Sequence, residues 1–249
     1  MKTHRRIMNR AASTVSAAAL TTTVATVLLL MSCVVVQAQE KAVWPKKPWQ
    51  EWTKKDVEQV LNESPWVQAR KILVPVGRAN APNDFTFILR LRSALPMRQA
   101  LVRQRQLEAK YDKMNERERA AFDAKTQGLL DCPACADNYV LTLTSRSENN
   151  PGFDWVYVSF SSVTLPWMKQ YAYIANEQGE ERRLVNFVQP KQQGVEAIFF
   201  FPRLDASGAP LIKPESKKLI FRLSPHNTSQ FSNFEFDVSK LMVDGNVLF

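Results

Sequence analysis

Histidine, glycine and cysteine are scarce in this 249-residue chain, which contains 2, 7 and 3 of them respectively. One histidine, His4, lies at the extreme N-terminus, so only His226 remains for a metal cluster or a catalytic triad. A metal site built on several histidines is thereby excluded. The glycines form neither a GxGxxG nor a GxxxxGK motif, and HExxH, GxSxG and SxxK motifs are also missing. We therefore expect no catalytic residues, no metal site and no cofactor, which disfavours an enzyme.

The overall composition is nevertheless that of a folded domain, with 45% hydrophobic and 23% charged residues. Such values exclude a disordered chain, a collagen-like fibre and a disulfide-dense miniprotein. The length suits one compact domain, with a helical appendage at most.

Positive charge is concentrated at the N-terminus, where four of the first ten residues are basic and the first acidic residue is Glu40. An uncharged run follows from residue 11 to residue 39. This order is typical of a secretory signal peptide, which we predict to span residues 1–38 with cleavage after Ala38. Without that segment the chain holds 29 basic and 24 acidic residues, so its net charge falls from +9 to +5.

Three alternatives remain for the N-terminal segment. The residues around Cys33 loosely resemble a lipoprotein box, in which this cysteine would be lipidated, and Arg5-Arg6 loosely resembles a twin-arginine signal. The uncharged run is also long enough to span a bilayer as an uncleaved anchor. Every alternative exports residues 41–249, and cleavage after Ala38 leaves residues 39–249 as a periplasmic or secreted domain. The protein would touch the membrane only through the N-terminal segment.

Residues 70–105 carry the strongest charge bias of the exported part, with eight basic residues and one acid, Asp84. Arg90 and Arg92 share one face of a predicted strand, and Arg98 follows in a predicted helix. We interpret these three arginines as contacts for an anionic envelope surface or a polysaccharide; the alternative is a solvated basic face. Aromatic residues do not alternate with the basic ones as on a single-strand platform, so we expect no nucleic acid.

Helical patterns dominate the first half of the exported part. Thr53 and Asp56 resemble a capping box and predict a short N-terminal helix that ends before Pro65. Residues 85–92 alternate between apolar and polar side chains and predict a strand. Two consecutive helices are predicted after it, as a helical insertion over about residues 96–128 that ends at a glycine.

From residue 138 onward the pattern predicts strands separated by turns. One of them, residues 195–201, is a continuous apolar run that favours a central strand buried on both faces. The predicted fold is therefore α+β, an antiparallel β-sandwich or open barrel with the helical insertion and the short N-terminal helix. The strands expected in this half cover residues 139–144, 155–162, 171–175, 182–188, 195–201, 219–223 and 234–238.

Cys132 and Cys135 form a CxxC pair, which we predict to be a disulfide in an exported protein. A structural bond is favoured over a catalytic one, because the pair follows a predicted helix and precedes a strand, the reverse of the thioredoxin order. Asp131 and Asp137 flank the pair and would raise a thiol pKa. A thiol–disulfide enzyme using this pair remains the alternative function.

A glycan-binding module is a further alternative. Four tryptophans fall within 23 residues, between Trp44 and Trp66, and could form a sugar-stacking platform. The favoured alternative is that Trp49 and Trp52 pack the first helix onto the core. Glycan cleavage would need two facing carboxyl groups. The acidic cluster of Glu177, Glu180 and Glu181 lies instead on a predicted hairpin tip.

Three stretches resemble a group of uncharacterised exported bacterial proteins. They are the Trp-rich N-terminal helix with its Ser64-Pro65-Trp66 motif, residues 179–185, and Phe199-Phe200-Phe201-Pro202. The resemblance implies export but no activity. The function that the sequence favours is a non-enzymatic envelope protein, a β-rich domain that binds a partner or a surface.

Overall fold

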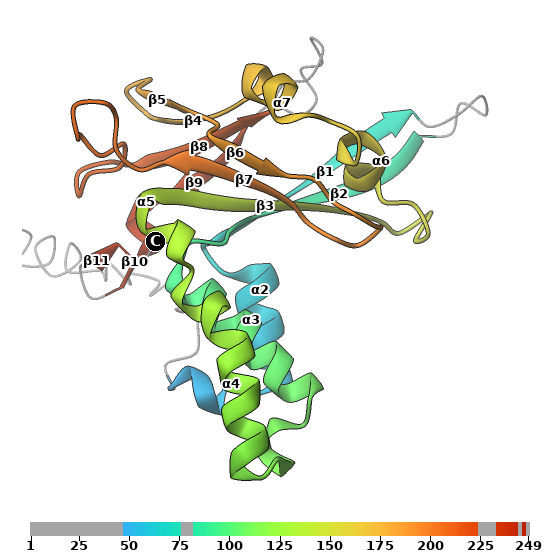
Figure 1. The fold of residues 1–249 in the computed structure, drawn as a ribbon. Coiled ribbons are helices and arrows are strands. Elements are labelled where there is room, and N and C mark those ends of the chain that lie inside the picture. Colours follow the sequence, from blue (N-terminus) through green and yellow to red (C-terminus); the bar gives the residue numbers. More distant parts are fainter. Residues whose placement is uncertain (1–46, 76–81, 224–232, 244–245, 248–249) are drawn as a thin grey trace, which may run out of the picture. The chain divides into compact units, whose positions relative to one another are not determined.

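The computed structural model describes residues 47–75, 82–223, 233–243 and 246–247. The predicted signal segment 1–38, Cys33, Trp44 and His226 therefore lie outside the described residues. Helices and two main antiparallel sheets make up an α+β fold, as predicted (Figure 1).

The N-terminal helix α2 (Lys54–Glu63) begins where the sequence places it. The Thr53 side chain accepts from the amide of Asp56, and the Asp56 carboxylate accepts from the amide of Thr53, so the predicted capping box is complete. The helix ends at Ser64, before Pro65, and buries Val57, Val60 and Leu61. A 3-10 turn, η1 (Trp49–Glu51), precedes it.

The first sheet has five strands in the order β1-β2-β3-β7-β6, and all neighbours are antiparallel. Its inner face carries large apolar side chains that alternate along the strands, such as Phe85, Phe87 and Leu89 on β2. Its strands are β1 (Val67–Pro75), β2 (Pro82–Leu91), β3 (Asn138–Ser147), β7 (Ala197–Pro202) and β6 (Asn186–Val188).

The second sheet has four antiparallel strands in the order β5-β4-β8-β9. A 3-10 turn, η5 (Val238–Leu241), follows it and leads into a small two-stranded pair. The strands are β5 (Glu181–Arg183), β4 (Ala172–Asn176), β8 (Lys218–Leu223) and β9 (Phe234–Asp237), and the small pair is β10 (Met242–Val243) and β11 (Asn246–Val247).

Aromatic rings fill the space between the two sheets. The Phe199 and Phe201 rings of β7 lie 5.3 Å and 6.0 Å from the Phe221 ring of β8, and all three side chains are fully buried. Ring pairs at these separations add to the burial of apolar area. The two sheets therefore pack face to face as a sandwich, the first of the two architectures that the sequence predicts.

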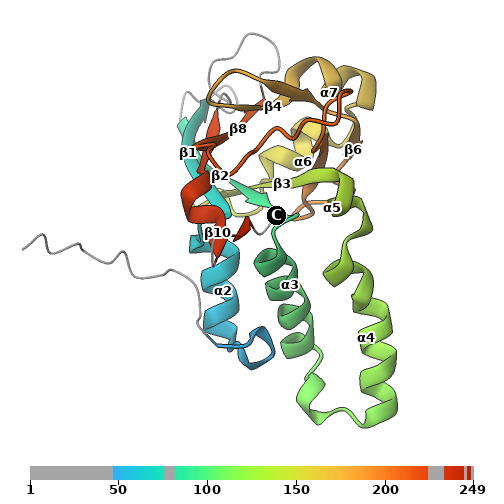
Figure 2. The same cartoon turned by 90° about the vertical axis from the view of Figure 1, so that its left-hand side faces the viewer.

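The helical insertion lies between β2 and β3, which are neighbours in the first sheet. It contains α3 (Leu95–Glu108), η2 (Tyr111–Lys113), α4 (Glu116–Asp131) and α5 (Pro133–Asp137). Figure 2 shows α3 and α4 side by side as a helical hairpin. The predicted end at residue 128 is wrong: Gly128 lies within α4, and the positive φ that ends this helix is taken by Cys132.

The strand predicted for residues 155–162 is a helix, α6 (Trp155–Phe160). The Asp154 carboxylate accepts from the amides of Val156 and Tyr157 and so begins the helix, while Val156 and Phe160 bury one side of it. Periodicity does not separate a strand from a helix in so short an apolar segment. A second short helix, α7 (Leu165–Tyr171), takes the first residue of the strand predicted for 171–175.

Strand β7 was predicted to be buried on both faces, but only one of its faces is fully buried. Ala197, Phe199 and Phe201 are inaccessible, whereas Ile198 and Phe200 on the outer face remain partly exposed. The strand predicted for 182–188 is divided between the two sheets, as β5 and β6. Strand β1 was not expected, since its basic side chains interrupt the apolar pattern.

Candidate functional site

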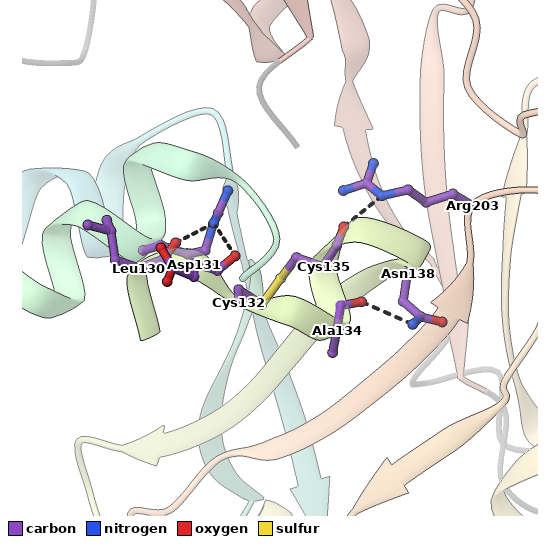
Figure 3. The surroundings of a disulfide bond; sticks show 8 residues. Leu130, Asp131, Cys132, Ala134, Cys135, Asn138 and Arg203 are labelled. Atoms are coloured by element: carbon purple, nitrogen blue, oxygen red, sulfur yellow. Dashed lines mark hydrogen bonds between the residues drawn. A yellow bond between two sulfur atoms is a disulfide. The ribbon is translucent and has the colours of Figure 1, made fainter. Parts of the chain in front are cut away.

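The disulfide lies at the junction between the helical hairpin and the first sheet (Figure 3). The Sγ atoms of Cys132 and Cys135 are 1.98 Å apart, and their Cα atoms 5.2 Å apart. Cys132 ends α4 and precedes α5, with a left-handed backbone at φ 43° and ψ 70°. Cys132 is partly exposed, whereas Cys135 is only 5% exposed. The pair thus joins one partly exposed residue to one buried residue.

Two arginines fix the backbone on either side of this pair. Arg98 of α3 donates from one guanidinium nitrogen to the carbonyl oxygens of Leu130 and Asp131, which directly precede Cys132. Arg203, which follows β7, donates through Nε to the carbonyl oxygen of Cys135 at 2.9 Å. Burial lowers the pKa of the Arg203 guanidinium, and the positive charge of Arg98 lowers it further. The two cations therefore converge on the CxxC segment.

Arg90 and Arg92 occupy the outer face of the first sheet, but their guanidinium groups bind within the protein. Arg92 donates to the Glu196 carboxylate at 2.7 Å, and Arg90 lies 3.7 Å from the same carboxylate. Glu196 also accepts from the hydroxyl of the fully buried Thr142 at 3.0 Å. The three charged side chains are only 15%, 19% and 24% exposed for Arg90, Arg92 and Glu196.

Arg90 is held further by the first helix and by β3. It donates to the carbonyl oxygen of Leu61 at 2.8 Å, to Asn62 Oδ1 at 3.1 Å and to Thr144 Oγ1 at 3.1 Å. The sequence predicts Arg90, Arg92 and Arg98 as one exposed basic face. The structure instead divides them between two internal networks, and the prediction of anionic contacts at these positions gains no support from their geometry.

A different pair of arginines lies on the outer face of the second sheet, where Arg183 is exposed and Arg222 is partly exposed. Tyr173 of β4 lies directly opposite Arg183 of β5 and Arg222 of β8 in the two ladders, so the three side chains share one face. The Arg183 and Arg222 guanidinium carbons lie 4.7 Å and 5.7 Å from the centre of the Tyr173 ring. Arg222 also donates to the Tyr173 hydroxyl at 3.0 Å. We call these three residues the Tyr173 cluster.

Part of the hydrogen-bonding capacity of the Tyr173 cluster is unused. The Arg183 side chain is 58% exposed and pairs with Glu181 at 2.9 Å. Arg222 Nε is a buried donor for which the structure shows no hydrogen-bond partner. An unpaired buried donor is unfavourable, and a ligand acceptor would remove that penalty only if the side chain turned its Nε towards the surface. The sequence predicts both strands of the β4–β5 hairpin, but only the register between β4 and β8 brings Arg222 to Tyr173.

Among the described residues of the predicted sugar-stacking platform, Trp49, Trp52 and Trp66 pack into the protein instead. Trp52 and Trp66 are each 1% exposed, and Trp49 packs against the core. Trp52 donates through Nε1 to the carbonyl oxygen of Lys47 at 3.1 Å. The alternative in which Trp49 and Trp52 pack the first helix onto the core is therefore confirmed, and Trp66 is buried as well.

Within the acidic cluster on the β4–β5 hairpin, Glu177 has a structural role. Its carboxylate accepts from the backbone amides of Lys217 and Lys218 at 2.9 Å and 3.1 Å. Burial alone would raise the pKa of Glu177, but these bonds and one from Gln178 lower it to about 2. A carboxyl group held in its ionised form does not suit the proton-donating role in glycan cleavage.

Glu177 should make the protein less stable in acid. Its pKa is depressed in the folded state, so its contribution is present above the ordinary value of 4.5 and is lost as the pH falls from 4.5 towards 2. We expect the melting midpoint of wild type to fall more steeply over this window than that of Glu177→Gln, as measured by circular dichroism. Parallel curves for the two proteins would contradict this expectation.

Within the parts of the chain that the structure describes, no group of three or more His, Cys, Asp or Glu side chains is arranged to hold a metal ion. No described helix has both the length and the apolarity required to cross a membrane. Comparisons with family models, curated proteins and solved structures find no match to this chain.

Proposed function

We propose that this chain is an exported, non-catalytic protein whose four-stranded sheet binds an anionic polysaccharide of the cell envelope. The observation that carries the proposal is the Tyr173 cluster, in which two guanidinium groups flank one aromatic ring on an outward-facing sheet surface. Guanidinium groups bind carboxylate and sulfate groups through paired, charge-assisted hydrogen bonds.

The charges around the cluster favour a polysaccharide over a lipid surface. Lys218 shares the outer face with the two arginines, but so do the acids Glu181, Glu235 and Asp237. A uniformly anionic bilayer would be repelled by these acids as well as attracted by the bases. A sugar polymer carries both spaced acidic groups and hydroxyl groups. Its acidic groups can pair with the arginines, and its hydroxyl groups can donate to the carboxylates.

The arrangement of side chains on neighbouring strands also suits an extended polymer. The exposed side chains of this face come from neighbouring strands about 5 Å apart, which is the usual spacing in a sheet. Ile220 and Ala175 lie on the same face and are 9% and 4% exposed, so the long charged side chains cover them. The surface available to a ligand is therefore polar, with the Tyr173 ring as its aromatic component.

Export is supported by two features of the sequence. The basic start and uncharged run of residues 1–38 have the order of a signal peptide or an anchor. The Cys132–Cys135 disulfide suits an oxidising compartment. A C-terminal reporter that is active only outside the cytoplasm should therefore be active in this fusion.

Binding should depend on both arginines of the Tyr173 cluster. We expect the wild-type protein to bind a polyuronate such as alginate, and Arg183→Gln with Arg222→Gln to weaken binding about 10-fold or more, because one lost charged contact costs about 1.5–3 kcal/mol. Affinity should also fall with added salt, since exposed charges are screened within about 8–10 Å at physiological ionic strength. Isothermal titration at several salt concentrations measures both effects.

The matched control is Arg117→Gln, which removes one exposed positive charge from α4. It should bind like the wild type. Vesicles of anionic lipid serve as the competing ligand. The proposal would be overturned if the control and cluster variants lost equal affinity, or if the protein bound the vesicles more tightly than the polyuronate. Absence of binding to the polyuronate would also overturn it.

A further inference from the structure

We propose that Cys132–Cys135 is a reversible thiol–disulfide exchange site, in which Cys132 is the sulfur atom attacked by an external thiolate. This activity is separate from polysaccharide binding at the second sheet. It departs from the structural role that the sequence favours, and three observations around the disulfide carry it.

The two cysteine residues differ in their exposure. Cys132 is partly exposed at the end of α4, whereas Cys135 is 5% exposed and lies within α5. An external thiol can therefore approach only Cys132 easily, and the exchange has a defined direction. Cys135 is placed to be the leaving sulfur on reduction and the resolving sulfur on re-oxidation.

The backbone around the pair is held without help from the sulfur–sulfur bond. The amide of Cys132 donates to the Gly128 carbonyl oxygen at 3.2 Å, and the amide of Cys135 to the Cys132 carbonyl oxygen at 2.7 Å. Arg98 holds the segment before the pair, and Arg203 holds the carbonyl of Cys135 (Figure 3). Because none of these hydrogen bonds involves a sulfur atom, we expect them to remain after reduction and to keep the two thiols close enough to re-form the bond.

Charge near the pair favours a thiolate. The guanidinium groups of Arg98 and Arg203 are bonded to the main chain on either side of the two cysteines, and cations in such positions stabilise a thiolate. Asp131 and Asp137 oppose them, as the sequence suggests. The Asp131 carboxylate, however, accepts from Gln127 Nε2 at 2.7 Å, one turn back along α4.

The exchange balances with a dithiol as the reductant. Its first thiolate attacks Sγ of Cys132, a mixed disulfide forms, the Cys132–Cys135 bond breaks, and Cys135 leaves as a thiolate that takes up a proton. The second thiol of the reductant loses its proton and attacks the reductant's sulfur in the mixed disulfide. Cys132 is released as a thiol. The cysteine pair gains two electrons and two protons, and the dithiol becomes a disulfide.

The first test uses the unaltered exported protein and dithiothreitol as the dithiol. We expect complete reduction under native conditions and complete re-oxidation by oxidised glutathione, with unchanged circular dichroism, counted by a maleimide that adds mass to each free thiol. A bond that resists dithiothreitol until the protein unfolds would overturn the proposal. So would a reduced protein that loses its fold or does not re-oxidise.

The second test compares the two single-cysteine variants, each checked by circular dichroism. In Cys135→Ser, Cys132 should react with iodoacetamide at least about tenfold faster than Cys135 does in Cys132→Ser, because thiol reactivity requires access and thiolate character. Adding Arg98→Gln to Cys135→Ser should move the pH midpoint of alkylation upward, and adding Arg117→Gln should not. Equal reaction rates for the two cysteines, or an unmoved midpoint with Arg98→Gln, would contradict the assignment.

Discussion

Replacing Phe199 by alanine should lower the free energy of unfolding by about 3–5 kcal/mol. Phe199 is fully buried, and its ring centre lies 5.2 Å from that of Phe187, 5.3 Å from Phe221 and 6.5 Å from Phe160. The truncation removes apolar contacts with both sheets and with α6, and leaves a cavity at their meeting point. Total stabilities of about 5–15 kcal/mol are usual for domains, so the loss should be conspicuous in urea denaturation.

Phe200 provides the matched control on the same strand. It is the adjacent residue with the same side chain, but it points to the outer face and remains partly exposed. Phe200→Ala should therefore lower the free energy of unfolding by less than half as much as Phe199→Ala. Equal losses for the two variants would show that the outer face is as well covered as the core and would contradict the sandwich packing described here.

Replacing Glu196 by glutamine should lower the free energy of unfolding by about 2–3 kcal/mol. This loss is smaller than for a fully buried ion pair, because the three side chains retain some contact with water. The change removes the carboxylate that Arg92 contacts at 2.7 Å and Arg90 at 3.7 Å, while both guanidinium groups stay mostly buried. Burial lowers the pKa of the Arg90 guanidinium, because it removes the charge from water. Glutamine leaves two neighbouring cations without their counter-charge.

Glu215→Gln serves as the control, because this glutamate is exposed and its loss changes the net charge by the same amount. It should leave the unfolding midpoint in urea nearly unchanged. If Glu196→Gln proves equally neutral, the pairs with Arg90 and Arg92 do not stabilise the fold. These arginines would then again be candidates for the external anionic contacts that the sequence predicts.

Elements with a local signal were predictable from the sequence. The capping box of Thr53 and Asp56 fixes the start of α2, and the alternation of residues 85–92 identifies most of β2. The α+β class and the insertion between two strands follow from the same kind of pattern. The pattern of residues 155–160 predicts a strand because its mostly apolar residues fit both periods, whereas the hydrogen bonds that Asp154 accepts from the amides of Val156 and Tyr157 begin a helix.

The partners of charged side chains were not predictable, because they depend on strand register. Glu196 is 104 residues from Arg92, and only the order β2-β3-β7 brings the two together. The same limit applies to Arg222 and Tyr173, which are 49 residues apart. The basic stretch of residues 70–105 therefore predicts a concentration of positive charge. It does not predict which of its arginines are already bound within the protein.

The most direct measurement of the proposed function is a titration of the 15N-labelled protein with an acidic oligosaccharide, followed by NMR. We predict that shift changes concentrate on β4, β5 and β8 and include the side-chain resonances of Arg183 and Arg222. Changes confined to the region of Arg90 and Arg92, or spread evenly over the surface, would contradict binding at the Tyr173 cluster.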